Sequence, residues 1–160
     1  MLENIEGVLK RMGTGQHRTY CAFNTTGESF LGLNICRADT PLATLRGMFG
    51  QFRMKSGEGV WFVPSRGIHT LALLGPMDLI YLNAKNCVIH LVEHGSPFRI
   101  APIRFGSSSV LKLPPHTIYS SQTHVGDHVL ICPQEEMEMF LKRAVPVLSS
   151  RNADGKGAGS

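Results

Sequence analysis

The chain has 160 residues, of which 42% are hydrophobic and 18% are charged. This hydrophobic share is too high for a disordered chain and suits one compact domain. The longest apolar stretch, residues 71–82, is interrupted by Gly75, Pro76 and Asp78. It is far shorter than the roughly 20 apolar residues of a transmembrane helix, so we expect no membrane span.

The charge pattern and the cysteines narrow the choice of partners and compartment. There are 16 basic and 12 acidic residues, a net charge of +4. Between Arg37 and Arg104 the basic residues are scattered singly. Nucleic-acid-binding proteins gather them on one face or in one run, so nucleic acid is a disfavoured partner. The N-terminus has neither the basic nor the apolar region of an export signal, and this predicts a cytoplasmic protein unless a signal has been removed. Four widely spaced cysteines in apolar surroundings are typical of reduced, buried thiols: Cys21, Cys36, Cys87 and Cys132.

Three regions follow one another along the chain. Residues 1–18 are expected to form an N-terminal helical extension, because apolar residues recur there every three or four positions. Residues 19–146 are expected to form a single mainly-β domain. Residues 147–160 end in a Gly-rich polar stretch and are expected to be a disordered tail.

Within the domain, short apolar segments separated by turn residues predict a series of β-strands. A short helix is expected near 41–49, where Asp39 or Thr40 caps the amides and Pro41 suits the first helical position. A C-terminal helix is expected near 134–144. Most connections are too short for helices between parallel strands, which favours a small antiparallel sandwich or barrel-like fold. The expected strands are 19–23, 30–36, 59–64, 67–74, 77–82, 86–92, 108–113 and 128–131.

Four stretches in a fixed order resemble the bacterial and archaeal family called domain of unknown function 192, over roughly residues 20–132. The resemblance implies a small, mainly-β single domain with a short helix after the Ala-Asp-Thr segment, and no established reaction. The stretches are Phe23-Asn24-Thr25-Thr26, Ala38-Asp39-Thr40 with Arg46-Gly47, Gly67-Ile68-His69-Thr70 with residues 76–83, and residues 110–114 with Val125-Gly126-Asp127.

The chain departs from the family pattern at three positions. Leu73 stands where many relatives have Met, Met77 stands for the usual Ile, and Lys112 stands for the usual Glu. A site built on that Met sulfur or that carboxylate is therefore not expected here.

The most suggestive pair of residues is His69 and Asp78. If their strands share a sheet, the carboxylate could orient the imidazole and raise its basicity, which is half of an acid–base pair. The structural interpretation is that two partly buried polar groups simply satisfy each other, and it is the favoured one. The candidate pocket consists of Trp61, Arg66, His69, Thr70 and Asp78.

Two further residues are secondary candidates. Arg46 could pair with Asp39 or reach an anion, and the pairing is favoured. Asp127 follows Gly126 before a strand, in a pattern typical of a turn whose carboxylate accepts nearby amides.

His90 and His94 have the spacing of a metal-ligand pair, but they fall in a predicted strand and turn, and His124 and His128 lie on either side of a Gly-Asp turn. Cysteine or carboxylate partners at ligand spacing are absent, so neither a metal nor a cofactor is predicted.

These observations favour an uncharacterised binding or accessory domain with a small pocket near His69 and Asp78. Its partner would be an unknown small ligand or protein. The alternative is an unrecognised enzyme that uses His69 and Asp78 as an acid–base pair, although no nucleophile motif accompanies them.

Overall fold

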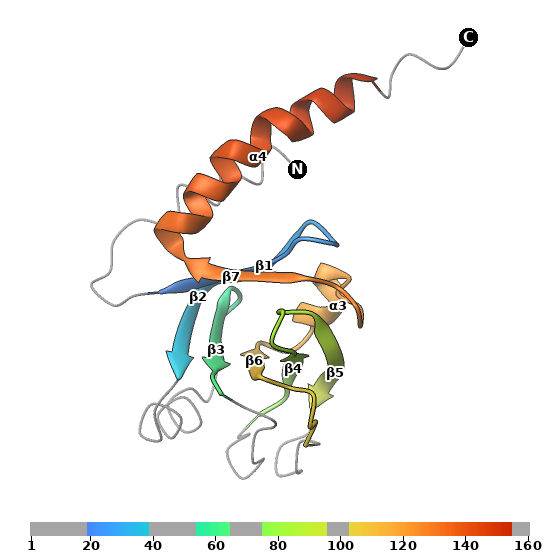
Figure 1. Ribbon diagram of the computed structural model, residues 1–160. Coiled ribbons are helices and arrows are strands. Elements are labelled where there is room, and N and C mark those ends of the chain that lie inside the picture. Colours follow the sequence, from blue (N-terminus) through green and yellow to red (C-terminus); the bar gives the residue numbers. More distant parts are fainter. Residues whose placement is uncertain (1–18, 39–53, 65–74, 96–102, 155–160) are drawn as a thin grey trace.

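The structure is a computed structural model that describes residues 19–38, 54–64, 75–95 and 103–154. In these residues, seven strands form one sheet, and a short and a long helix accompany it (Figure 1). The elements are β1 (Tyr20–Asn24), β2 (Ser29–Ala38), β3 (Glu58–Phe62), β4 (Met77–Leu82), β5 (Val88–Gly95), β6 (Ser109–Leu113), α3 (Thr117–Ser121), β7 (Val129–Pro133) and α4 (Gln134–Asp154). The prediction of a mainly-β, barrel-like domain is confirmed.

The strand order in the sheet is β5-β4-β6-β3-β2-β1-β7. All neighbours run antiparallel except β2 and β3, which are parallel and pair from Asn34↔Glu58 to Ala38↔Phe62. The sheet is therefore antiparallel, as predicted, except at this one pair. The connection from Ala38 to Glu58 is long enough for the crossover that parallel strands require.

The sheet curls until its two edge strands meet at one end. A bridge pairs Cys87 with His128, just before β5 and β7 begin. Beside it, the Val88 amide donates to the Asp127 carbonyl and the Gly126 amide donates to the Val88 carbonyl, each at 2.8 Å. Gly126 has φ of 99°, a conformation that favours glycine. The sheet is thus a half-barrel whose two edge strands are joined by hydrogen bonds at this end.

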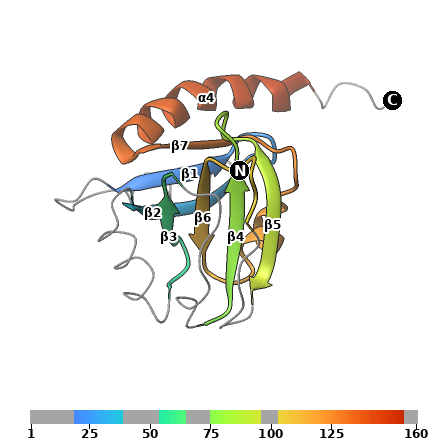
Figure 2. The same cartoon turned by 60° about the horizontal axis from the view of Figure 1, so that its bottom comes forward.

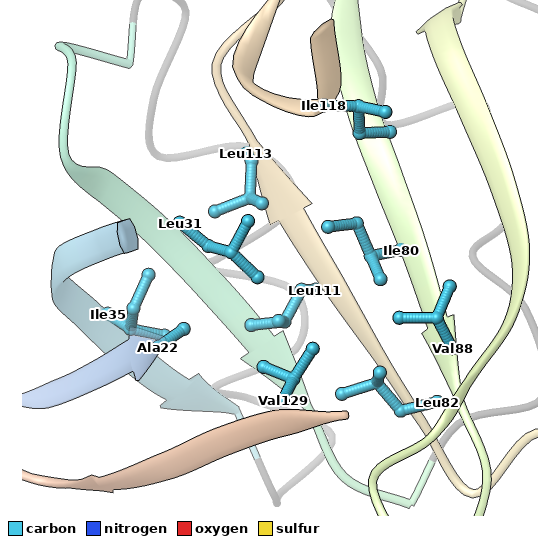
Figure 3. Close-up of a cluster of buried hydrophobic side chains, with 10 residues drawn as sticks. All are labelled: Ala22, Leu31, Ile35, Ile80, Leu82, Val88, Leu111, Leu113, Ile118 and Val129. Carbon is cyan, nitrogen blue, oxygen red and sulfur yellow. The ribbon is translucent and has the colours of Figure 1, made fainter. Parts of the chain in front are cut away.

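The interior of the half-barrel holds the largest apolar cluster, shown in Figure 3. The helix α3, which the sequence analysis did not predict, contributes Ile118 to it. Such interior packing by side chains is how small barrels fill their centre. The buried members are Ala22, Leu31, Ile35, Ile80, Leu82, Val88, Leu111, Leu113, Ile118 and Val129.

Helix α4 lies across β7 and β1 on the outer face of the sheet (Figures 1 and 2). Met137 and Leu141, one helical turn apart, pack on Cys21, Phe23 and Cys132. The helix begins at Gln134 as predicted but continues to Asp154, ten residues past the expected end. Residues 147–154 are therefore helical rather than part of a disordered tail. A proline such as Pro146 removes one helical hydrogen bond without forbidding helix on both sides.

A second outer cluster covers the opposite part of the sheet, on β3, β4 and β6 with the end of β2. We call this surface the second outer face. Its buried apolar members are Ala38, Val60, Phe62, Met77, Leu79, Tyr81 and Val110. The expected N-terminal extension 1–18, the helix 41–49 and the strand 67–74 lie outside the described residues.

Candidate functional site

The candidate residues divide into two groups. Trp61, Asp78 and Asp127 lie in described parts of the chain. The remaining candidates, Arg46, Arg66, His69 and Thr70, lie outside them. The pairing of His69 with Asp78 therefore stays a prediction, whereas the hydrogen bonds of Asp78 to described residues are shown.

Asp78 lies in β4, faces the barrel interior and has no exposed surface. Its Oδ1 accepts a hydrogen bond from the His94 amide at 2.9 Å, and its Oδ2 accepts one from the Ile118 amide at 2.8 Å. Both carboxylate oxygens are thus engaged by backbone donors. Charge-assisted bonds of this kind are about twice as strong as neutral ones.

Each of these bonds supports an irregular piece of backbone. The register between β4 and β5 shifts beside Asp78, and His94, with φ of 53°, lies at this bulge. Helix α3 begins after His116, whose own side chain makes no capping bond. The Asp78 carboxylate performs the capping role from a strand that is far away in sequence. Asp78 therefore fixes the positions of β5 and α3 together.

Trp61 lies on the same interior face and is half-buried. The Tyr20 ring meets it edge-on at 5.6 Å between centroids, and the Arg37 guanidinium lies 5.4 Å from the centre of the indole. The indole Nε1 is buried and finds no acceptor among the described residues. Leaving such a donor unsatisfied costs roughly 1–3 kcal/mol, so this atom is suited to receive an acceptor from a ligand.

Trp61 and Asp78 are not adjacent, although they share a face. Trp61 pairs with Leu111, and Asp78 pairs with Leu113 on the other side of β6. Two strand spacings put them about 10 Å apart across the sheet. The side chains of Leu111, Leu113 and Ile80 fill the intervening interior. The Trp61 ring and the Asp78 carboxylate are therefore separate features of the interior.

Asp127 belongs to a buried polar network rather than to an open site. Its Oδ2 accepts from the His124 amide at 2.9 Å, the turn expected from the sequence, and from the Asn24 side chain at 2.8 Å. The Asn24 amide also donates to the Thr123 hydroxyl, and its Oδ1 accepts from the amides of Thr26 and Gly27. Asn24 was not singled out by itself, but the Asn-Thr-Thr-Gly turn sequence that begins with it was a usable signal.

A third polar group, on the second outer face, was missed by sequence reasoning. Tyr81 is fully buried, and its hydroxyl has no partner in the described part of the chain. Its ring lies 5.4 Å from that of His90, and the Arg104 guanidinium is 3.1 Å from His90 Nε2. Lys112, buried on the same face, has a pKa lowered by desolvation. Tyr81 pairs with His90 across β4 and β5, and Arg104 contacts His90 from a later segment, so the register of the sheet brings these three together.

A pair of histidine rings is the nearest approach to a metal site among the described residues. The rings of His94 and His116 lie 4.5 Å apart, yet no group of three or more metal-ligating side chains occurs in the described ranges.

Among those same residues, no helix is both long and apolar enough to cross a membrane.

Comparison with known proteins gives fold relatives rather than an activity. None of the curated proteins matches the chain. A protein of unknown function from Novosphingobium aromaticivorans DSM 12444 is 17% identical, with a TM-score of 0.58 over 69% of this chain and 82% of that one. A "putative transcription regulator" from Sinorhizobium meliloti 1021 is 15% identical, with a TM-score of 0.59 over 72% of this chain and 97% of that one. At these identities the likeness concerns the fold alone.

The family comparison covers most of the domain. The model of domain of unknown function 192, described as Uncharacterized ACR, matches residues 22–131. That range runs from Ala22 in β1 to Ile131 in β7, and it includes Asp78 and the Asn24–Asp127 network. The resemblance noted in the sequence is thereby confirmed, and the chain belongs to the family of domain of unknown function 192.

Proposed function

We propose that this protein is a binding or accessory module whose ligand contacts Trp61. The observation that carries the proposal is the buried indole N–H of Trp61, which has no acceptor among the described residues. Arg37 and Tyr20 flank the ring, so a ligand there would meet a hydrogen-bond donor, a cation and an aromatic edge. A small planar molecule or a peptide carbonyl suits this combination.

The predicted pocket residues that follow Trp61 in the chain are proposed to complete the site. Arg66, His69 and Thr70 supply donors of the same kind, and they come within nine residues of Trp61. Asp78 takes a supporting role in this proposal, since its oxygens already hold the amides of His94 and Ile118. In this proposal the Trp61 end of the interior binds the ligand, and Asp78 holds the backbone in place at the other end.

The test uses Trp61 itself as the reporter, because it is the only tryptophan of the chain. Free amino acids, nucleosides, small carboxylic acids and short peptides are titrated separately while Trp61 emission is recorded. At least one class is expected to change the emission saturably. His69→Gln should weaken that binding about tenfold or more, the usual cost of losing a hydrogen bond to a charged or strongly polar group.

A matched control makes the result specific. Lys85 is exposed in the turn between β4 and β5, and Lys85→Gln should bind as the unmodified protein does. If no ligand class saturates the signal, or if His69→Gln and Arg66→Gln both bind normally, the proposed pocket is wrong.

The alternative function is an enzyme in which His69 and Asp78 act as an acid–base pair. The engagement of both Asp78 oxygens by backbone amides argues for the binding module over this alternative. Chromogenic esters, phosphate esters, amides and glycosides distinguish the two. Turnover that disappears in folded His69→Gln would favour the enzyme and displace the binding proposal.

A further inference from the structure

The buried hydroxyl of Tyr81 is the starting point for a second site, on the opposite face of the sheet from Trp61. Tyr81 has no exposed surface, and its oxygen has no hydrogen-bond partner in the described ranges. Buried tyrosine hydroxyls are normally hydrogen-bonded, so an unpartnered one requires an explanation. Burial raises the pKa of Tyr81 to about 12, which keeps the hydroxyl protonated and able to donate.

His90 lies beside the Tyr81 ring, and Arg104 in turn contacts His90. Tyr81 pairs with His90 on β5, and their ring centroids are 5.4 Å apart. Arg104, just before β6, places Nη2 3.1 Å from His90 Nε2. Because a guanidinium can only donate, Nε2 must be the acceptor and the imidazole is neutral. Desolvation, and then the Arg104 charge, lower the pKa of His90, consistent with that form.

The group is cationic, and its described members offer donors. The Arg104 charge partly opposes the rise in the pKa of Tyr81 and lowers the pKa of His90. Arg104 makes no ion pair with any carboxylate of the described residues. A hydroxyl donor beside a planar two-pronged cation matches the two oxygens of one carboxylate.

We propose that Tyr81 and Arg104 bind the carboxylate group of a small ligand on the second outer face, with His90 as a positioning residue for Arg104. The Tyr81 hydroxyl donates to one carboxylate oxygen, and the guanidinium contacts the other. This site is independent of the pocket proposed at Trp61, because the two residues lie on opposite faces of the sheet.

The experiment measures acetate binding to the full chain by NMR chemical-shift titration at constant ionic strength, with chloride as the balancing anion. Acetate is expected to bind saturably to the unmodified protein. Tyr81→Phe should abolish saturation or weaken it at least about tenfold, and Arg104→Gln should weaken it by a similar factor. Circular dichroism and urea unfolding confirm that each variant is folded.

Three comparisons keep the proposal falsifiable. Tyr119→Phe changes an exposed tyrosine on α3 and should bind acetate normally. Inorganic phosphate should bind more weakly than acetate, and a preference for phosphate would overturn the carboxylate assignment. Saturable acetate binding that survives in both Tyr81→Phe and Arg104→Gln, or its absence from the unmodified protein, would overturn the site itself.

Discussion

Two buried polar regions of this domain differ in how completely they are hydrogen-bonded. Around Asn24, the side chain uses its amide hydrogens on Thr123 and Asp127, and its oxygen accepts two backbone amides. At Tyr81 the hydroxyl is equally buried but has no partner among the described residues. A fully satisfied network stabilises the fold, whereas an unsatisfied group costs free energy and needs another explanation.

This difference distinguishes the polar groups that stabilise the fold from those that are available to a ligand. The Asn24 network joins the turn after β1 to the turn before β7, where the half-barrel is closed. Asp78 plays a similar part for β5 and α3. The indole N–H of Trp61 and the hydroxyl of Tyr81, in contrast, donate no hydrogen bond to any described residue. Ligands are therefore expected at the unsatisfied donors, and contributions to stability at the satisfied groups.

The largest effect is expected from Asn24→Ala. It removes the partners of several buried groups at once, each worth roughly 1–3 kcal/mol, so the free energy of unfolding should fall by at least about 3 kcal/mol. Urea denaturation measures it. Ser120→Ala, which deletes an exposed hydrogen bond to the Thr117 carbonyl, should stay within about 0.5 kcal/mol. Equal effects for the two variants would remove the contrast between the regions.

Asp78→Asn comes next, because it keeps the shape but leaves a single acceptor oxygen for two amides. A loss of about 1–3 kcal/mol is expected. Hydrogen exchange should show where the loss acts, with the amides of His94 and Ile118 exchanging faster and those of the Asn24 turn unchanged. Unaltered exchange at both His94 and Ile118 would contradict the supporting role given to Asp78.

Tyr81→Phe is expected to act in the opposite direction. Without ligand, deleting an unpartnered buried hydroxyl should raise the free energy of unfolding by about 1 kcal/mol, since its desolvation cost disappears while the ring packing stays. Thermal unfolding in acetate-free buffer is the appropriate measurement. A clear destabilisation instead would mean that the hydroxyl has an internal partner, which would also weaken the carboxylate proposal.

The smallest effect concerns the thiols beneath α4. Burial raises the pKa of Cys21 to about 12 and that of Cys132 to about 11, both from 9.0. The folded state therefore binds these protons more tightly, so their contribution to stability is complete below pH 9 and is lost as pH rises through 11 and 12.

Alkylation at neutral pH should modify exposed Cys36 first. Rapid modification of Cys21 or Cys132 in the folded protein would show that α4 does not cover them.

The sequence indicated local elements better than pairings between them. Strand β4 was predicted with its observed bounds, because Pro76 and Asn83 enclose a run of apolar residues. The parallel pairing of β2 with β3 is non-local and leaves no mark on either strand. Helix α3 was missed because it has five residues and takes its capping acceptor from Asp78, 40 positions earlier.

The need of Asp78 for hydrogen-bond partners could be predicted from the sequence, but the partners themselves could not. The reasoning that a buried Asp78 needs a partner was sound, and the observed partners are the amides of His94 and Ile118. Nothing local to Tyr81 or His90 distinguishes them from other strand residues, so their meeting with Arg104 depends on the register of the sheet. The pairing of His69 with Asp78 stays a prediction.

The pairing of β1 with β7 has a consequence for biosynthesis. Tyr20 pairs with Pro133, so the first of the described strands to leave the ribosome receives one of its two neighbours from the last of them. Until residues 121–133 emerge, Asn24 and the outward side of β1 stay exposed to water and to other nascent chains. Such long-range closure folds slowly, and chain termination before β7 should yield an open, aggregation-prone sheet.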